Sequence, residues 1–151
     1  MIADDGDIIR GLGYVTLYSA YLEEAIDEVV EALIAHSVPA DRHLVRAPAS
    51  RKIRFCRDAV ARLISSNEEM AHLDQALDYA SQLLEERNVV VHGRIYANFG
   101  APDVRRSGRP GVLDQEATAG ELYNLANKLC DATGPLMHGA MFSIHRAFTK
   151  P

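Results

Sequence analysis

Three side chains suited to acid–base and phosphate chemistry lie within six residues of one another. They are Arg87, Asn88 and His92, and they close a long stretch in which apolar residues recur at helical spacing. On an α-helix Asn88 and His92 would share a face, because residues four apart lie on the same side. Arg87 would sit about 140° around from His92, a gap that only a side chain as long as arginine could bridge. Three valines (89–91) separate them, and since valine is costly to expose, we expect this turn to pack on at least one side.

Such a trio could cleave a phosphodiester without a metal ion. Histidine titrates near neutral pH and can move the proton of a ribose 2′-hydroxyl or of the leaving oxygen. Arginine stays charged, binds two phosphate oxygens at once and stabilises charge that grows there. Asparagine can orient either partner or the ribose. A structural interpretation stands beside this one, because arginine and histidine at a helix end are also common as surface or capping residues.

The string RNVVVHG (residues 87–93) resembles the Arg-Asn-x-x-x-His signature of the HEPN superfamily, which closes a helix and is often followed by glycine. The resemblance extends more loosely to the order of helices along the chain, from a long first helix with glycines near its start to a long last helix. HEPN domains are small all-α bundles that generally dimerise through the motif region. Many are metal-independent ribonucleases of toxin–antitoxin, phage-defence or RNA-processing systems, and some members have no known catalysis.

The resemblance implies a role for each motif residue. Arg87 would hold phosphate, His92 would handle the proton or stabilise the transition state, and Asn88 would orient the substrate. Two motifs facing each other across a homodimer would make one composite site that needs no cofactor and no metal. The products would carry a 2′,3′-cyclic phosphate, and DNA, which lacks the 2′-hydroxyl, would be inert. The tyrosine motif at the C-terminus of some HEPN toxins has no match in this chain.

The partners implied are therefore a second copy of the chain, RNA and, for a toxin, an antitoxin or another protein. The alternative is a non-catalytic HEPN-like module that uses the same helices for dimerisation, partner binding or nucleotide binding.

Length and composition indicate a single domain spanning residues 1–151. Hydrophobic residues make up 48% of the chain and charged residues 25%, which is typical of a globular protein. No apolar run approaches the roughly 18 residues of a transmembrane helix, and the acidic start of the chain lacks the basic region of a secretory signal. We therefore expect a cytoplasmic protein that makes no membrane contact, with Cys56 and Cys130 reduced and in its core.

Charge is segregated along the chain. The net charge of −5 disfavours a general nucleic-acid binder, yet segments 41–62 and 87–109 are basic whereas 1–31 and 68–86 are acidic. One interpretation is that opposite segments pack side by side. The other is that the basic segments converge on the motif and hold an RNA backbone. The second interpretation predicts RNA contacts from Arg94, Arg105, Arg106, Arg54 and Arg57.

Helical spacing of apolar residues predicts helices over 8–33, 50–65, 67–91 and from Asp114 or Thr118 to Ile144, with a kink or break at Gly134-Pro135. Gly11 and Gly13 in the first helix could permit close helix approach. Residues 94–99 alternate with period two and 104–111 could return as a polar strand, forming a lid, a substrate guide or an ordinary insertion. The expected fold class is all-α, an antiparallel bundle of four to five helices with a small β-hairpin or loop insertion after the motif helix.

Overall fold

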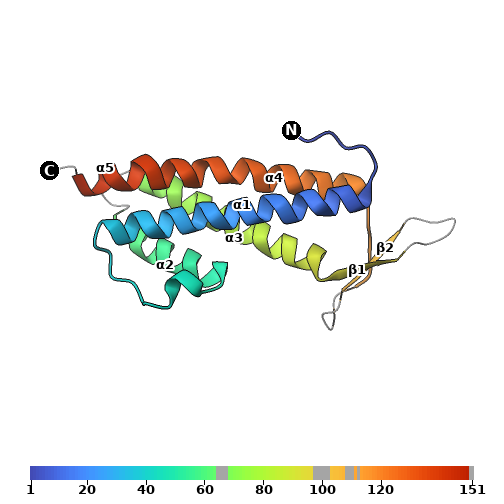
Figure 1. Cartoon of the computed structure of the whole chain (residues 1–151), viewed down its shortest axis with the longest axis horizontal. Helices are drawn as coiled ribbons and strands as arrows, with labels where there is room; N and C mark the ends of the chain where they lie inside the picture. The colour runs from blue at the N-terminus through green and yellow to red at the C-terminus, as the bar shows by residue number, and fades with distance from the viewer. Residues whose placement is uncertain (64–67, 97–102, 108–110, 112, 150–151) are drawn as a thin grey trace. The chain divides into compact units, whose positions relative to one another are not determined.

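The structure is a computed structural model, and it describes residues 1–63, 68–96, 103–107, 111 and 113–149. The chain is mostly helical and carries a small antiparallel sheet, as the sequence predicts (Figure 1). Its α-helices are α1 (Ile8–Ala35), α2 (Ala49–Ala61), α3 (Glu68–Val91), α4 (Ala119–His138) and α5 (Ile144–Thr149). A short 3-10 helix spans Leu44–Arg46, and a π-helix spans Gly139–Ser143 between α4 and α5. Among the described residues, none of the helices combines the length and apolarity needed to span a bilayer.

The chain divides into two compact units. The motif unit comprises Met1–Ala20 and Leu83–Cys130, and the helical unit comprises Tyr21–Gln82 and Asp131–Pro151. Helices α1, α3 and α4 each contribute one segment to each unit.

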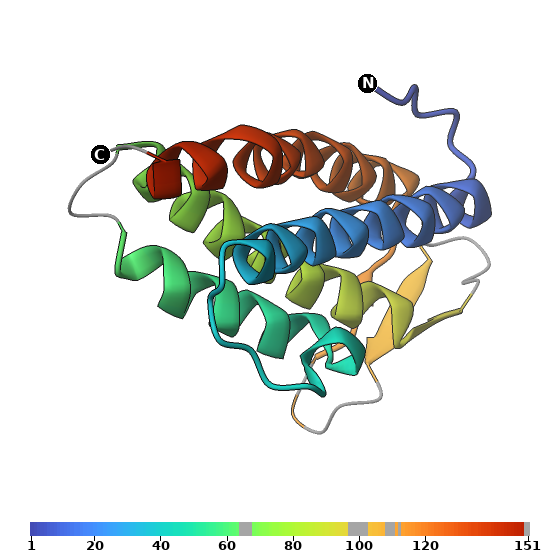
Figure 2. The same ribbon diagram turned by 60° about the vertical axis from the view of Figure 1, so that its left-hand side comes forward.

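The motif unit contains the sheet, whose strand order is β1-β2-β3. Strands β1 (Gly93–Tyr96) and β2 (Val104–Ser107) pair antiparallel, with Arg94 opposite Arg106 and Ile95 opposite Arg105. These strands form the hairpin that the alternating pattern predicts, although residues 97–99 and 108–110 of the expected strands lie outside the described residues. A third strand, β3 (Gln115–Glu116), pairs with β2 and was not predicted. In Figure 2, β1 continues directly from the end of α3.

Helix α4 forms much of the core of the motif unit. Thr118, one of the two predicted start points, caps α4 by accepting a hydrogen bond from the Glu121 amide at 3.2 Å. The buried side chains then follow at helical spacing, namely Leu122, Leu125, Ala126 and Leu129. Cys130 follows Leu129 and is exposed, although it lies four residues after the buried Ala126. The expectation that Cys130 lies in the core is wrong, whereas Cys56 is buried as predicted.

The helical unit is held by an apolar core and by ion pairs between its helices. Its largest fully buried side chains are Leu22, Ile26, Leu33, Met70, Leu77, Leu136, Ile144, Val29 and Val60. Lys52 of α2 contacts Asp27 of α1 at 2.5 Å, and Arg146 of α5 contacts Glu69 of α3 at 2.9 Å. At the end of α1, the His36 ring stacks on Phe148 with ring centroids 4.8 Å apart.

Two predicted boundaries in the helical unit need correction. Helix α2 ends at Ala61, and the expected end near residue 65 and the expected start of α3 at Asn67 lie outside the described residues. Of the kink or break predicted at Gly134-Pro135, the break is wrong, because α4 continues through Pro135 to His138, and the kink stays a prediction. The irregular turn comes later, in the π-helix at Gly139–Ser143. Each backbone hydrogen bond of a π-helix spans five residues and not four, so this turn is wider than a turn of α-helix.

Candidate functional site

The three motif residues lie where α3 ends and β1 begins. Arg87 and Asn88 are in the last turn of α3, and His92 is the residue that joins α3 to β1. The His92 amide donates a hydrogen bond to the Asn88 carbonyl at 3.1 Å, so the helical hydrogen-bond pattern extends one residue past Val91. Asn88 and His92 therefore lie one above the other on the same side of this helix end.

The environments of the three side chains differ. His92 is exposed, whereas Arg87 and Asn88 are half-buried. The Nε atom of Arg87 has almost no contact with solvent, and this side chain already interacts within the chain. The Asn88 amide lies 3.5 Å from a Glu85 carboxylate oxygen, a long distance for a hydrogen bond. The site thus offers an accessible histidine and a half-buried arginine at one helix end.

The three valines between Asn88 and His92 face different environments. Val90 is buried and Val89 is half-buried, whereas Val91 keeps 40% of its surface exposed. The expectation that this turn packs on at least one side is confirmed. The other side carries an exposed valine next to the exposed histidine, so apolar surface lies at the edge of the candidate site.

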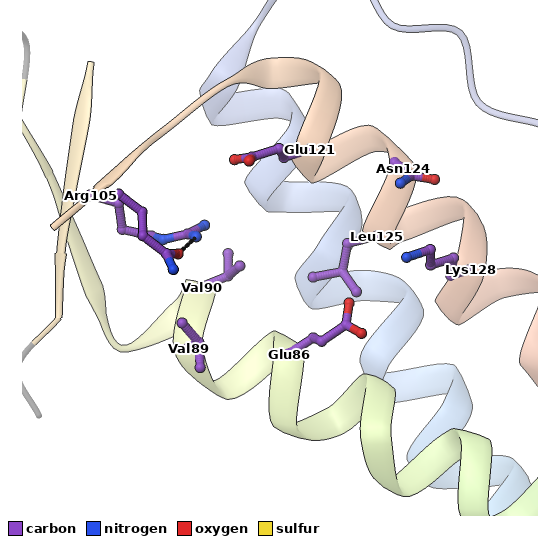
Figure 3. Close-up of a pocket in the computed structure, with 9 residues that line it drawn as sticks. Glu86, Val89, Val90, Arg105, Glu121, Asn124, Leu125 and Lys128 are labelled. Atoms are coloured by element: carbon purple, nitrogen blue, oxygen red, sulfur yellow. Dashed lines mark hydrogen bonds between the residues drawn. The ribbon is translucent and has the colours of Figure 1, made fainter. Parts of the chain in front are cut away.

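A cavity of about 320 Å³ opens beside the same helix end (Figure 3). Figure 3 shows Glu86, Val89 and Val90 of α3 on one side, Glu121, Asn124, Leu125 and Lys128 of α4 on the other, and Arg105 of β2 at one end. The charged lining residues are two carboxylates (Glu86 and Glu121) and two cations (Arg105 and Lys128). The apolar part of the lining comes from Val89, Val90 and Leu125. Arg87, Asn88 and His92 do not line this cavity, so the motif side chains belong to a different surface of the motif unit.

Gly93, which follows the histidine, permits a close approach between α3 and the sheet. A Cβ atom at this position would lie 2.8 Å from Cγ of Arg105 and 3.1 Å from the Val89 carbonyl oxygen. Both distances are shorter than ordinary van der Waals contact. A side chain at residue 93 would therefore push Arg105 away from the cavity or move β1 away from α3.

The strand register separates the predicted RNA-contacting arginines of the hairpin. Successive residues of a strand point to opposite faces, so Arg105 and Arg106 cannot serve the same surface. Arg105 lies with Ile95 on the cavity side, where its guanidinium donates to Gln115 Oε1 at 2.7 Å. Arg106 lies with Arg94 on the opposite face.

On that opposite face, Arg106 is 5.1 Å from the ring centroid of Tyr96 and donates to Asp114 Oδ2 at 3.1 Å. Arg94, Tyr96 and Arg106 are all exposed. Tyr96 was not among the predicted site residues. Period-two alternation with Arg94 was the sequence signal that could have placed it on their surface.

The two remaining predicted contacts, Arg54 and Arg57, belong to the helical unit. Arg57 donates to Asp74 at 2.8 and 3.2 Å and to Asp78 at 2.5 Å, which joins α2 to α3. Hydrogen bonding to Asp74, more than any other contact, raises the pKa of Arg57. Its charge is thus compensated within the chain. Arg54 is exposed and borders an open cavity of about 530 Å³ together with Arg57.

Neither a search for metal-binding clusters nor comparisons with known proteins assigns a function to this site. Within the described parts of the chain, no cluster of three or more His, Cys, Asp or Glu side chains is arranged to hold a metal ion. Comparisons with protein-family models, curated proteins and solved structures found no match.

Proposed function

We propose that the chain is a HEPN-like, metal-independent endoribonuclease of the toxin or defence type, which acts in the cytoplasm as a homodimer. Each protomer would contribute Arg87, Asn88 and His92 to a composite site. The observation that carries the proposal is the placement of an exposed His92 on the same side of a helix end as Asn88, with the half-buried Arg87 one residue before Asn88. An acid–base group, an orienting amide and a phosphate-binding cation thereby occur within about one and a half helical turns.

In the proposed reaction, His92 accepts the proton of the ribose 2′-hydroxyl, and the 2′-oxygen attacks the adjacent phosphorus. The bond from phosphorus to the 5′-oxygen breaks, and this oxygen takes a proton from a second histidine, the copy of His92 in the other protomer. The products are a 2′,3′-cyclic phosphate and a free 5′-hydroxyl. Arg87 binds the phosphate oxygens, on which charge grows in the transition state.

The surface around the motif supports the need for a second copy. In one chain His92 projects from the protein surface, and the neighbouring Val91 is 40% exposed. A second protomer packed on Val91 would remove this apolar surface from water and place two histidines near each other. An antitoxin or another protein partner could cover the same surface in a regulated state.

The alternative function is a non-catalytic module for dimerisation, partner binding or nucleotide binding. It is favoured by carboxylates next to the predicted cationic residues, with Asp114 on Arg106 and Asp74 and Asp78 on Arg57. The net charge of −5 points the same way.

Cleavage of RNA in EDTA tests the proposal. The wild type should cut RNA and leave DNA intact, and His92→Ala should lower the rate by about 100-fold or more, the usual contribution of a general acid or base. Arg87→Ala should have a comparable effect because it removes the phosphate-binding cation. His43→Ala and Arg46→Ala are matched controls, since both side chains are exposed in the loop between α1 and α2, and both variants should cut normally.

Folding and dimerisation of all four variants are checked by circular dichroism and light scattering. A wild type that cuts no RNA, or that cuts DNA equally fast, would contradict the proposed chemistry. If His92→Ala and Arg87→Ala instead lose stability or dimerisation while RNA remains uncut by the wild type, the non-catalytic module is the better explanation.

A further inference from the structure

One face of the sheet carries an exposed aromatic ring beside a cross-strand pair of arginines. We call it the outer sheet face, and it consists of Arg94, Tyr96 and Arg106. The β1–β2 register places Arg94 directly opposite Arg106, and Tyr96 lies two residues beyond Arg94 on the same strand. Tyr96 keeps 45% of its surface exposed. The ring is therefore accessible to a ligand that could stack on it.

The composition of the outer sheet face matches the chemistry of single-stranded nucleic acid. Proteins that bind single strands stack bases on exposed aromatic rings and use cationic side chains to follow the backbone. The Arg106 guanidinium lies 5.1 Å from the Tyr96 ring centroid, so ring and cation already adjoin. Arg94 stands on the edge strand β1 directly opposite Arg106, where it could bind a second phosphate of the same strand of RNA.

We propose that the outer sheet face binds an unpaired nucleotide of single-stranded RNA, with its base stacked on Tyr96 and its flanking phosphates on Arg94 and Arg106. A single strand is required because in a duplex both faces of each base are covered by neighbouring pairs. The binding itself does not depend on catalysis. Its role in selecting the cleaved RNA rests on the proposed ribonuclease function.

Carboxylates near the outer sheet face do not prevent this binding. Asp114 pairs with Arg106, but the two side chains are 51% and 63% exposed, and ion pairs between such exposed groups are weak. Phosphate can therefore replace Asp114 on Arg106. Glu116 of β3 lies opposite Val104, at the edge of the sheet away from β1. Repulsion from Glu116 would keep the RNA on β1 and β2.

The outer sheet face is connected directly to the motif. His92 immediately precedes β1, and Tyr96 is the last residue of that strand. An extended strand rises by about 3.3 Å per residue, so Tyr96 lies about 13 Å or less along the chain from His92. A base stacked on Tyr96 would belong to a nucleotide close to the bond that His92 would cleave. The enzyme would then prefer RNA with an unpaired base beside the cleaved bond.

Fluorescence anisotropy with a short, labelled 2′-O-methyl oligoadenylate tests the binding. This probe has no free 2′-hydroxyl, so the proposed reaction cannot consume it. Tyr96→Ala should weaken binding by roughly 5- to 100-fold, the range found for loss of one base-stacking contact. Tyr96→Phe should bind like the wild type because the ring is kept. Tyr79→Ala, which removes another exposed tyrosine, should have no effect.

The salt dependence of binding tests the two arginines. Arg94→Gln and Arg106→Gln should each lower the slope of log affinity against log salt by about 0.7, the value expected for one phosphate contact with a single strand. A duplex of the same sequence should bind more weakly than the single strand to the wild type.

Three results would overturn the proposal: no binding of the oligoadenylate, equal binding by Tyr96→Ala and wild type, or loss of binding in Tyr96→Phe. Its failure is separable from that of the ribonuclease function. If Tyr96→Ala cuts RNA normally and binds the probe like the wild type, the ribonuclease proposal is supported and the stacking site is rejected. If the probe binds through Tyr96 but RNA is never cut, the stacking site is supported and the ribonuclease proposal is rejected.

Discussion

Within the motif unit, a buried tyrosine of α4 holds the N-terminal segment in place. Tyr123 of α4 is 2% exposed, and its hydroxyl donates a hydrogen bond to Asp5 at 2.6 Å. This bond is the main reason why the pKa of Asp5 is lowered, with the Asp7 amide and Arg10 adding to the effect. Burial, followed by the contact with Asp5, raises the pKa of Tyr123 to about 12. Folding therefore favours a neutral tyrosine beside an ionised aspartate.

This pair predicts how stability changes with pH. The contribution of Tyr123 is fully present below its unfolded pKa near 10 and is lost as pH rises from about 10 to 12. The contribution of Asp5 is present above its unfolded pKa near 4 and is lost as pH falls through the lower folded value. Tyr123→Phe should lower Tm by a constant amount between about pH 4 and 10, and the difference from wild type should shrink outside that range. A Tm difference that stays unchanged up to pH 12 would show that folding does not raise the pKa of Tyr123.

At the residue scale, sequence spacing indicated which residues share a helix or strand. It did not indicate which side chains from other elements they contact. Arg57 belongs to a basic segment, and only the packing of α2 on α3 reveals that Asp74 and Asp78 bind it. Cys130 lies in an apolar stretch, four residues after the buried Ala126, yet it is exposed, so helical spacing alone did not predict its burial. The environment of Tyr96 likewise depends on the pairing of β1 with β2, which no local pattern specifies in register.

At the element scale, the two glycines near the start of α1 should respond oppositely to alanine. A Cβ on Gly11 would lie 3.0 Å from Cβ of Leu122 and 3.1 Å from the Tyr123 ring, whereas a Cβ on Gly13 would have no neighbour within 4 Å. Gly13→Ala should raise the free energy of unfolding by up to about 1 kcal/mol through helix propensity alone. Gly11→Ala should lower it by about 1 kcal/mol net, because overpacking costs about 1–3 kcal/mol and exceeds that gain.

Urea unfolding of the two glycine variants measures both effects. Leu122 is 2% exposed and its Cβ is fixed to the backbone of α4, so it cannot rotate away from a new methyl group. Equal stabilisation by the two substitutions would show that α1 and α4 can separate at Gly11 without loss. The sequence suggested close approach at both glycines, and the structure assigns it to Gly11.

The elements themselves were predicted to different degrees. Long helices were found from the sequence because apolar residues repeat over many turns, and each turn adds to the signal. Strand β3 was missed because its two residues are too few to show any alternation. The irregular turn of the last helix was assigned to Pro135, where a hydrogen-bond donor is missing. The chain instead keeps α4 through this residue and widens the helix at Gly139–Ser143.

At the scale of the whole molecule, the acidic and basic segments of the sequence form ion pairs that join neighbouring helices. In the helical unit, Lys52 pairs with Asp27, and Arg57 pairs with Asp74 and Asp78. These pairs join helices whose segments carry opposite charge, which supports the interpretation that such segments pack side by side. Cationic groups for RNA are then fewer than the sequence suggests, and Arg94 and Arg106 beside the motif become the stronger candidates.

A composite site makes activity depend on association, which gives a last prediction. If each site needs two chains, the cleavage rate should fall with the square of protein concentration once the dimer dissociates, and light scattering should show monomers at the same concentrations. Val91→Glu should act in the same direction, because it would bury a charge where we propose that two protomers meet. Val45→Glu is the matched control, since Val45 is an exposed valine in the 3-10 helix.

The two valine variants separate a composite site from a site within one chain. Val91→Glu should be monomeric and inactive at concentrations where Val45→Glu is dimeric and active. Restored cleavage at high concentrations of Val91→Glu would strengthen the argument, because mass action would then compensate for the weaker interface. A monomeric Val91→Glu variant that cuts RNA as fast as the wild type would place all the necessary groups in one chain. Arg87, Asn88 and His92 would then have to act without a second copy.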